Sequence, residues 1–357
     1  MQPQANYIPV EVIFNPNWWH RNYGISFDQS FYLNRKQRIA NDVSMRRALH
    51  ERFGIGEADP QPRPIIGSQF IAGGFVIPAL LGVEIRFSAA EAAWPVPIDL
   101  SCEKIMALRP PDIRTTWPMN VLIADMDELE KEFGYVIGDF NTGGVFNTSM
   151  ELRGQQLFVD LLEDEELVRH LFSVVAETEM AVLEYVRART GTASVAVNRS
   201  IVNVDPRIHI ESNCSVQMIS PAVYRRCLLP WHKQVSQCRA PFGIHHCGDN
   251  LQIFASAYAE THSVFYDVGW GSDVVRCSAE LPDAFLNLRL SPVRLLQGTA
   301  KEAHNDAVTL LRSAGRASKV GLCCINMDHG TPDENVRAIF AAAREFAASA
   351  DAARTAS

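Results

Sequence analysis

Short apolar runs alternate with helical patterns along most of the chain. Runs of apolar or alternating residues that end in polar or glycine-rich turns indicate strands. These runs are Gly134–Phe140, Arg207–Ser212, Phe242–His246, Val264–Val268, Ala284–Leu290 and Lys319–Ile325. Strands that alternate with helices favour a parallel sheet joined by right-handed crossovers. The pattern therefore predicts an α/β fold.

Amphipathic helices are expected after several of these strands. Apolar residues recur at helical spacing over residues 165–189. A capping hydroxyl followed by proline marks three further helix starts, at Ser220-Pro221, Ser291-Pro292 and Thr331-Pro332. We expect Pro230 to end or bend the helix predicted over residues 222–237, because proline lacks the backbone N–H that a helix interior needs.

The order of elements suits a closed barrel better than an open doubly wound sheet. No Gly-rich nucleotide-binding turn opens a helix, and the chain beyond residue 62 is long enough for an eight-fold barrel. We therefore predict a (β/α)8 TIM barrel over residues 63–357. Residues 1–62 are rich in aromatic and arginine side chains, and we predict that they form an N-terminal extension packed on the barrel.

Composition places the chain among ordinary globular proteins, with 357 residues, 47% hydrophobic and 21% charged. A formal net charge of −8 gives no electrostatic reason to expect binding to nucleic acid or anionic lipid. No apolar run reaches the roughly 20 residues of a membrane span, and the first residues lack the pattern of a secretory signal. We therefore expect a cytoplasmic protein with reduced cysteines, and we leave its oligomeric state open, a homodimer included.

His245 and Cys247 are the most informative residues of the sequence. They follow an apolar strand, and alternation along that strand points both side chains to the same side. Cys323 and Cys324 lie near the end of the last predicted strand. Strand ends of this kind carry the active sites of β/α barrels. One imidazole and two thiolates suit zinc, and three protein ligands leave its fourth position open for chemistry.

The charge of such a centre indicates which chemistry it suits. Two thiolates and a neutral imidazole cancel the two positive charges of zinc, which makes the ion a weak Lewis acid. It is then better suited to binding a thiolate, ether or amine than to generating hydroxide, so a zinc hydrolase is disfavoured. A purely structural zinc would need a fourth protein ligand. The remaining cysteines are predicted to be structural: Cys102, Cys214, Cys227, Cys238 and Cys277.

The order of several motifs resembles a known family. The motifs are Glu151-Leu152-Arg153-Gly154, Met218-Ile219-Ser220-Pro221, Leu229-Pro230, His245-His246-Cys247-Gly248-Asp249, and Cys324 before Thr331-Pro332-Asp333-Glu334. From about residue 130 to 345 they resemble the uroporphyrinogen decarboxylase superfamily, and within it the zinc-dependent, corrinoid-linked methyltransferases. The resemblance implies zinc held by His245, Cys247 and Cys324. Cys323 remains the alternative last ligand, because Cys324 lies one residue farther from Thr-Pro than the family pattern.

The resemblance also implies an activity. It implies a zinc-dependent methyltransferase that moves a methyl group from a small methylated substrate to the Co(I) corrinoid of a partner protein. Aromatic side chains near the N-terminus favour a methoxylated aromatic or similar donor. One alternative is transfer from a methylcorrinoid to a thiol or tetrahydrofolate. The weaker alternative is decarboxylation, because residues 14–20 lack the arginines that hold porphyrinogen carboxylates in the decarboxylases.

Further site residues are predicted from their positions near strand ends and in the aromatic N-terminal region. Glu84 is a candidate displaceable fourth zinc ligand, with an exposed surface carboxylate as the alternative, and Asn213 is a second candidate catalytic residue. The candidate substrate-binding residues are Trp19, Tyr23, Asp139, Asn141 and Asp267. Trp19 and Tyr23 have a second interpretation, in which these aromatic side chains anchor the extension to the barrel.

Overall fold

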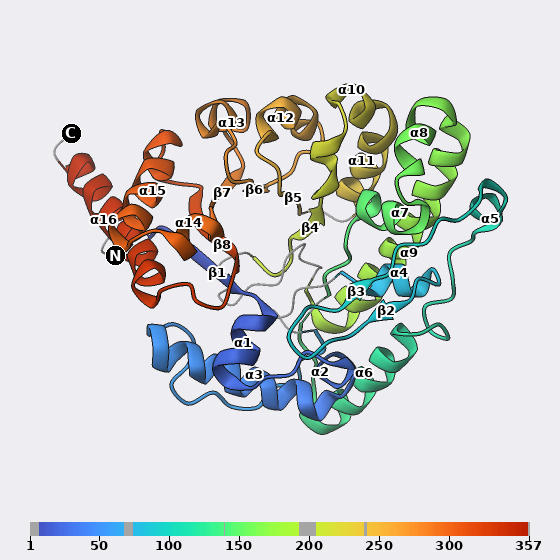
Figure 1. The fold of residues 1–357 in the computed structure, drawn as a ribbon, viewed down its shortest axis with the longest axis horizontal. Helices are drawn as coiled ribbons and strands as arrows, with labels where there is room; N and C mark the ends of the chain where they lie inside the picture. Colours follow the sequence, from blue (N-terminus) through green and yellow to red (C-terminus); the bar gives the residue numbers. More distant parts are fainter. Residues whose placement is uncertain (1–6, 68–73, 139, 193–204, 239–240, 356–357) are drawn as a thin grey trace.

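A curved parallel sheet lies at the centre of the computed structural model, which describes residues 7–67, 74–138, 140–192, 205–238 and 241–355. The sheet has six strands in the order β1-β8-β7-β6-β5-β4. They are β1 (Val10–Phe14), β4 (His209–Ser212), β5 (Phe242–His246), β6 (Phe265–Val268), β7 (Phe285–Leu290) and β8 (Val320–Met327). Figure 1 shows these strands surrounded by helices.

The helices and the remaining short elements fill the chain between the strands. The helices are α1 (Pro16–Tyr23), α2 (Gln29–Leu33), α3 (Arg35–Phe53), α4 (Val76–Leu80), α5 (Cys102–Ala107), α6 (Met119–Phe133), α7 (Val145–Arg153), α8 (Gln156–Glu163), α9 (Glu165–Thr190), α10 (Pro221–Val223), α11 (Leu229–Cys238), α12 (Leu251–Ala259), α13 (Val274–Glu280), α14 (Pro292–Gln297), α15 (Ala300–Ser313) and α16 (Asp333–Thr355). A short antiparallel pair joins β2 (Ile85–Arg86) to β3 (Trp94–Pro95).

The predicted α/β class with a parallel sheet is confirmed, whereas a closed eight-stranded barrel is not seen in the described parts of the chain. There, β1 and β4 are the edges of the sheet. A separate parallel bridge joins Ile65 to Ile137. The strand predicted over Gly134–Phe140 is present only as this bridge within the described residues.

Strand β1 lies within the predicted N-terminal extension. Val10 and Val12 pair with Leu322 and Cys324 of β8, in parallel register. Residues predicted to pack outside the barrel therefore supply an edge strand of the sheet. The strand is short and is followed almost directly by α1. Because aromatic residues dominate this region, the sequence did not indicate a strand followed by a helix. The domain boundary at residue 62 remains a prediction.

The other predicted strands and the long helices agree with the structure. Strands β4 to β8 match five predicted strands, α9 matches the amphipathic helix predicted over residues 165–189, and α16 follows the helix start predicted at Thr331-Pro332. Helix α9 begins after Asp164, whose side chain accepts the N–H of Leu167 as a cap. Before Pro230 the chain forms a π-helical turn over Tyr224–Leu228 and then continues as α11. The expected bend thus takes the form of a wider turn that accommodates the missing N–H.

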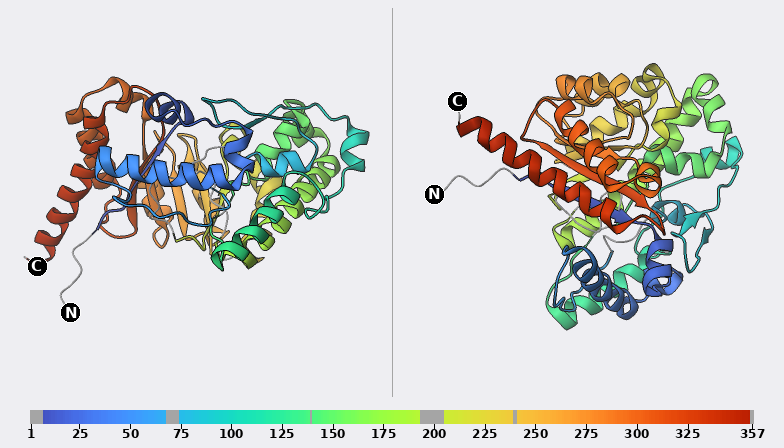
Figure 2. Two further views of the ribbon diagram at one scale, coloured as in Figure 1. Left: turned by 90° about the horizontal axis from the view of Figure 1, so that it is seen from below. Right: turned by 60° about the vertical axis from the view of Figure 1, so that its left-hand side comes forward.

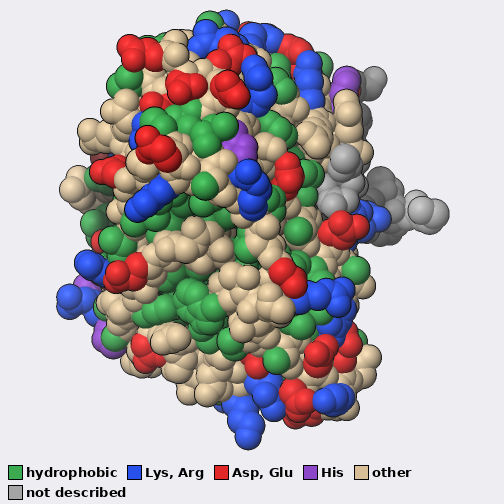
Figure 3. Space-filling view, turned by 90° about the vertical axis from the view of Figure 1, so that its right-hand side faces the viewer, with side chains coloured by type: hydrophobic (Ala, Val, Ile, Leu, Met, Phe, Trp, Pro, Cys, Tyr) green, Lys and Arg blue, Asp and Glu red, His purple; other side chains and the backbone are tan. Residues whose placement is uncertain are grey.

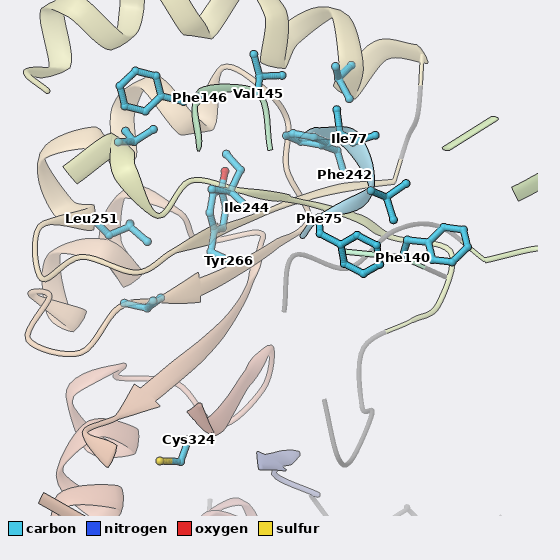
Figure 4. Packing of buried hydrophobic residues seen from close by; sticks show 14 of the residues in the cluster. Phe75, Ile77, Phe140, Val145, Phe146, Phe242, Ile244, Leu251, Tyr266 and Cys324 are labelled. Atoms are coloured by element: carbon cyan, nitrogen blue, oxygen red, sulfur yellow. The ribbon is translucent and has the colours of Figure 1, made fainter. Parts of the chain in front are cut away.

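The two faces of the sheet carry different side chains. The outer face packs under the helices in the main hydrophobic core, where Phe242, Ile244 and Tyr266 lie (Figure 4). The inner face has an apolar layer of Ile208, Ile210, Phe265 and Phe285. Beyond this layer, toward the carboxyl ends of the strands, the buried inner residues include His245, Asp267, Asn287 and Arg289. This polar end of the inner face is where a β/α barrel places its active site.

The ends of the chain and the surface complete the fold. Helix α16 packs against α15 and touches β1, so the two ends of the described chain lie on one side of the molecule (Figure 2). On the side that carries α5 and α8, acidic and basic side chains are interspersed (Figure 3). No helix among the residues searched is both long enough and apolar enough to cross a membrane.

Candidate metal centre and its cavity

Three side chains meet where strands β4 and β5 end. The Sγ atoms of Cys214 and Cys247 lie 3.0 Å apart, and Nε2 of His245 lies 2.9 Å from the Sγ of Cys247. All ligand atoms of these three residues lie within 4.8 Å of one another. We call Cys214, His245 and Cys247 the Cys–His group. Its atoms are close enough together to share one metal ion.

The pairing of β4 with β5 brings the Cys–His group together. Ser212 lies opposite His245 in the parallel register. Cys214 follows two residues after Ser212, and Cys247 follows two residues after His245, so the two cysteines take corresponding positions beyond neighbouring strand ends. The N–H of Asn213 donates to the carbonyl of His245 over 2.8 Å and extends the pairing by one residue.

A chain of hydrogen bonds holds the imidazole of His245. Its Nδ1 lies 2.6 Å from Oδ2 of Asp267. Asn287 donates from Nδ2 to Oδ1 of Asp267 over 2.9 Å and to Oε2 of Glu11 over 2.8 Å. Because the carboxylate accepts the Nδ1 proton, Nε2 is directed toward the thiols in the form that binds metal. Asp267, predicted to bind substrate, thus contacts the histidine of the site.

The three residues of the Cys–His group differ in the direction in which their pKa values are shifted. The hydrogen bond from Cys214 and the charge of His245 hold the pKa of Cys247 well below its usual value. The same bond raises the pKa of Cys214 well above its usual value, because its thiol donates to Cys247. Burial lowers the pKa of His245, but Cys247 and Asp267 outweigh burial and raise it. A divalent cation would therefore displace protons from Cys214 and His245 when it binds.

The donor set fits zinc. Two sulfurs and one imidazole nitrogen, with a carboxylate behind the histidine, are the ligand types and the outer partner that zinc sites use. Among the described residues, no fourth His, Cys, Asp or Glu joins the group. Three protein ligands leave a position for a substrate atom, as catalytic zinc sites do.

The Cys–His group opens into a cavity of about 730 Å³, a size that suits a small organic ligand. Its apolar lining includes Ala93, Trp94, Pro95, Pro97, Met150 and Ile325. Its polar lining includes Asn141, Asn147, Glu151, Gln155, Ser212, Ser215, Asn326 and Arg289. The cavity therefore combines a largely apolar wall with a few polar groups beside the candidate metal position.

Cys324 does not join the Cys–His group. It points to the outer face of the sheet, where it is buried in the main hydrophobic core (Figure 4). Burial raises its pKa to about 12, so it remains a thiol. Because alternate strand residues face opposite sides, the neighbouring Cys323 faces inward, opposite Arg289 in the register. The structure thus brings together His245 and Cys247 of the three predicted ligands, with Cys214 beside them instead of Cys324.

The other predicted site residues are spread widely. Asn141 lines the cavity. Glu84 is exposed, with Oε1 3.5 Å from Nε of Arg86, and does not line the cavity. The side chain of Asn213 is buried and directed toward Tyr258, with Nδ2 3.4 Å from its hydroxyl. Asp139 lies outside the described residues.

Trp19 and Tyr23 belong to α1, away from the cavity lining. Trp19 is fully buried and packs edge-on against Phe14 and Trp18. Tyr23 is partly exposed and lies against both tryptophans. This packing agrees with the interpretation in which the aromatic residues anchor α1 to the sheet.

Two polar residues of the cavity were not predicted. Arg289 is 7% exposed, and its Nε and Nη1 have no hydrogen-bond partner. Glu151 has an Oε2 without a hydrogen-bond partner, and burial raises its pKa to about 8. Arg289 could have been found as the charged residue at an alternate position of an apolar strand. Glu151 belongs to the motif Glu151-Leu152-Arg153-Gly154, but nothing in the sequence indicates that its side chain is buried.

A second group of acidic and histidine residues lies on the outer face of the sheet. Glu179 of α9 and His209 and Glu211 of β4 are fully buried, and their ligand atoms also lie within 4.8 Å of one another. Oε1 of Glu211 accepts the N–H of Val145 over 2.9 Å, and Thr142 donates to Glu179. None of these residues lines the cavity. The group joins β4 to α9 and to the start of α7.

Comparison with known proteins reveals a similar fold but no similar sequence family. No protein-family model matches the sequence, and no curated protein matches it. Among solved structures, a methyltransferase from Methanosarcina mazei superimposes with a TM-score of 0.66 and 16% sequence identity. The match covers 96% of this chain and 95% of that one. The chain therefore shares its fold with that methyltransferase over almost its whole length.

Proposed function

We propose that the protein is a zinc-dependent methyltransferase that moves a methyl group from a small methylated substrate, such as a methoxylated aromatic compound, to the Co(I) corrinoid of a partner protein. The observation that carries the proposal is the Cys–His group at two adjacent strand ends, facing a cavity of ligand size. The fold shared with a methyltransferase supports methyl transfer.

Each residue of the site has a part in this reaction. Cys214, His245 and Cys247 would hold the zinc. When bound, zinc would stabilise the negative charge that develops on the atom from which the methyl group departs. Asp267 keeps the proton of His245 on Nδ1, so that Nε2 remains available as a ligand. The apolar wall with Trp94 would hold the substrate in line for attack.

Glu151 would supply the proton that the reaction consumes. When Co(I) takes the methyl group from an ether, the carbon–oxygen bond breaks and its electron pair stays on oxygen, which must then take up one proton. Glu151 lines the same cavity and carries a proton at neutral pH, because burial raises its pKa to about 8. A carboxylic acid with such a pKa is well matched to general acid catalysis near pH 7.

Decarboxylation of a porphyrinogen is supported less well. An acidic tetrapyrrole needs several converging cations. Within the described lining of the cavity, Arg289 is the one arginine, and there is no lysine.

The proposal is tested by mixing zinc-loaded protein with Co(I) cobalamin and methoxylated aromatic compounds while the corrinoid absorption is recorded. Conversion to methylcobalamin, at a rate that depends on protein and zinc, is expected. A Cys247→Ser variant serves as the matched control and should give the rate without protein. Absence of methylcobalamin, together with transfer from methylcobalamin to a thiol or tetrahydrofolate, would contradict the proposed direction and support the reverse one.

A further inference from the structure

Arg289 is a buried cation without a carboxylate partner. It lies on the inner face of β7, lines the cavity, and is 7% exposed. Its Nε and Nη1 have no hydrogen-bond partner, although the side chain hydrogen-bonds to Cys247, and among the described residues it forms no ion pair with a carboxylate. Burying a guanidinium without hydrogen-bond acceptors costs free energy. Two N–H groups of a side chain that lines the cavity therefore lack an acceptor.

Three anionic groups act on Arg289, and one of them, Cys247, is already its hydrogen-bond partner. The charges that act on it are those of Cys247, Cys323 and Asp267. Asp267 already accepts hydrogen bonds from His245 and Asn287. Zinc bound by the Cys–His group would neutralise the thiolate charge of Cys247. Arg289 then keeps its positive charge and its two N–H groups without an acceptor, beside a weaker negative charge than before.

We propose that Arg289 binds a carboxylate of the substrate, so that the substrates are methoxylated aromatic acids. The identification of the methoxy group rests on the proposed function, whereas the carboxylate rests on Arg289 alone. A substrate carboxylate would supply an acceptor that the guanidinium lacks, together with a compensating negative charge. Trp94, Pro97 and Met150 of the same cavity supply apolar surface for the aromatic ring.

The test compares two probes of nearly the same size, 4-methoxybenzoate and its neutral amide, 4-methoxybenzamide. Binding of each to zinc-loaded protein is measured by titration calorimetry without any corrinoid. We expect the acid to bind at least about tenfold more tightly than the amide, as a charged hydrogen-bonded pair provides. Arg289→Gln should remove this preference while binding the amide as the wild type does. Arg289→Lys should retain part of this preference, because lysine keeps the positive charge but not the planar arrangement of N–H donors.

Arg86→Gln is the matched control. Arg86 is exposed on β2, next to the strand that carries Trp94, so it is the alternative source of positive charge near the cavity. This variant should keep the full preference for the acid. The zinc content and unfolding temperature of every variant are measured, and if Arg289→Gln does not fold, the wild type and Arg289→Lys still decide the question.

Three results would overturn the inference: equal affinities of the two probes for the wild type, no binding of the acid, or an undiminished preference in Arg289→Gln or Arg289→Lys. The same experiments distinguish a failure of this inference from a failure of the proposed function. If the acid binds through Arg289 but no methylcobalamin forms, the carboxylate site stands and the methyl transfer does not. If 4-methoxybenzamide is demethylated as fast as the acid at equal low concentrations, the methyl transfer stands and the carboxylate site does not.

Discussion

Nδ1 of His245 lies 2.6 Å from Oδ2 of Asp267, and both side chains are fully inaccessible to solvent. A buried carboxylate in this position fixes the tautomer and the orientation of the imidazole and makes it a stronger donor to a metal. The pair therefore gives Asp267 a positioning role, because it acts on the candidate metal through the histidine.

Replacing Asp267 should weaken metal binding without abolishing it. Asp267→Asn keeps the size of the side chain but loses the charge, and the expected loss of zinc affinity is about 10- to 100-fold. Competition with a chelator of known affinity measures this change. Asp249→Asn, at an exposed carboxylate two residues beyond Cys247, is the control and should keep the wild-type affinity. Equal affinities of Asp267→Asn and wild type would contradict the positioning role.

The cysteine ligands can be identified by zinc content. Cys214→Ser and Cys247→Ser should each lose most of the zinc that the purified wild type carries, because each removes a thiolate ligand. Cys324→Ser is the matched control and should keep it, since this thiol faces the hydrophobic core. Elemental analysis of the three variants gives the answer. Zinc lost from Cys324→Ser but retained by Cys214→Ser would favour the ligand set implied by the family resemblance.

Glu151 should make the stability of the fold depend on pH. Its pKa in the folded protein is about 8, above its usual 4.5, because burial penalises the charged form. Its stabilising contribution is therefore full below about pH 4.5 and is lost as the pH rises through about 8. At roughly 1.4 kcal/mol per unit of pKa shift, the loss is on the order of a few kcal/mol.

Urea unfolding at pH 5 and at pH 8.5 tests this expectation. Glu151→Gln cannot ionise, so its free energy of unfolding relative to wild type should increase between the two pH values. Exposed Glu84, replaced by Gln in the same way, is the control and should show no such change. A constant difference between Glu151→Gln and wild type across this range would show that Glu151 titrates normally.

Trp19 should matter for stability and not for the site. Trp19→Ala removes a fully buried ring that packs on Phe14 and Trp18, and we expect a loss of about 3–5 kcal/mol in the free energy of unfolding. Tyr23→Ala, at a partly exposed ring of the same helix, should cost clearly less. Chemical unfolding gives both values, and calorimetry with 4-methoxybenzoate should give the wild-type affinity for both. If folded Trp19→Ala bound 4-methoxybenzoate more weakly than the wild type does, Trp19 would have to be counted among the substrate-binding residues.

Local patterns were sufficient for most of the fold. Strands β4 to β8 and helices α9 and α16 have clear apolar periodicity, and their sequence order led directly to a parallel sheet. Strand β1 was missed because it is short and lies among the aromatic residues of the N-terminal region, and its pairing with the distant β8 leaves no local pattern.

The candidate site was only partly predictable, for a related reason. His245 and Cys247 share one strand end, so alternation alone placed them together. Cys214 reaches them through the register of β4 with β5, which the sequence does not display. The side of the last strand that each cysteine faces depends on the same kind of information, so Cys324 was favoured although it points into the core.

The pairing of β1 with β8 has a consequence for the order of events during synthesis. Strand β1 leaves the ribosome long before β8, the strand beside which it must lie, has been made. Until then β1 has no place in the sheet, and Glu11, which it carries, cannot accept the hydrogen bond from Asn287 that steadies Asp267 and His245. The hydrogen bonds behind the candidate metal centre of a nascent chain are therefore completed only after β8 has been made and has paired with β1.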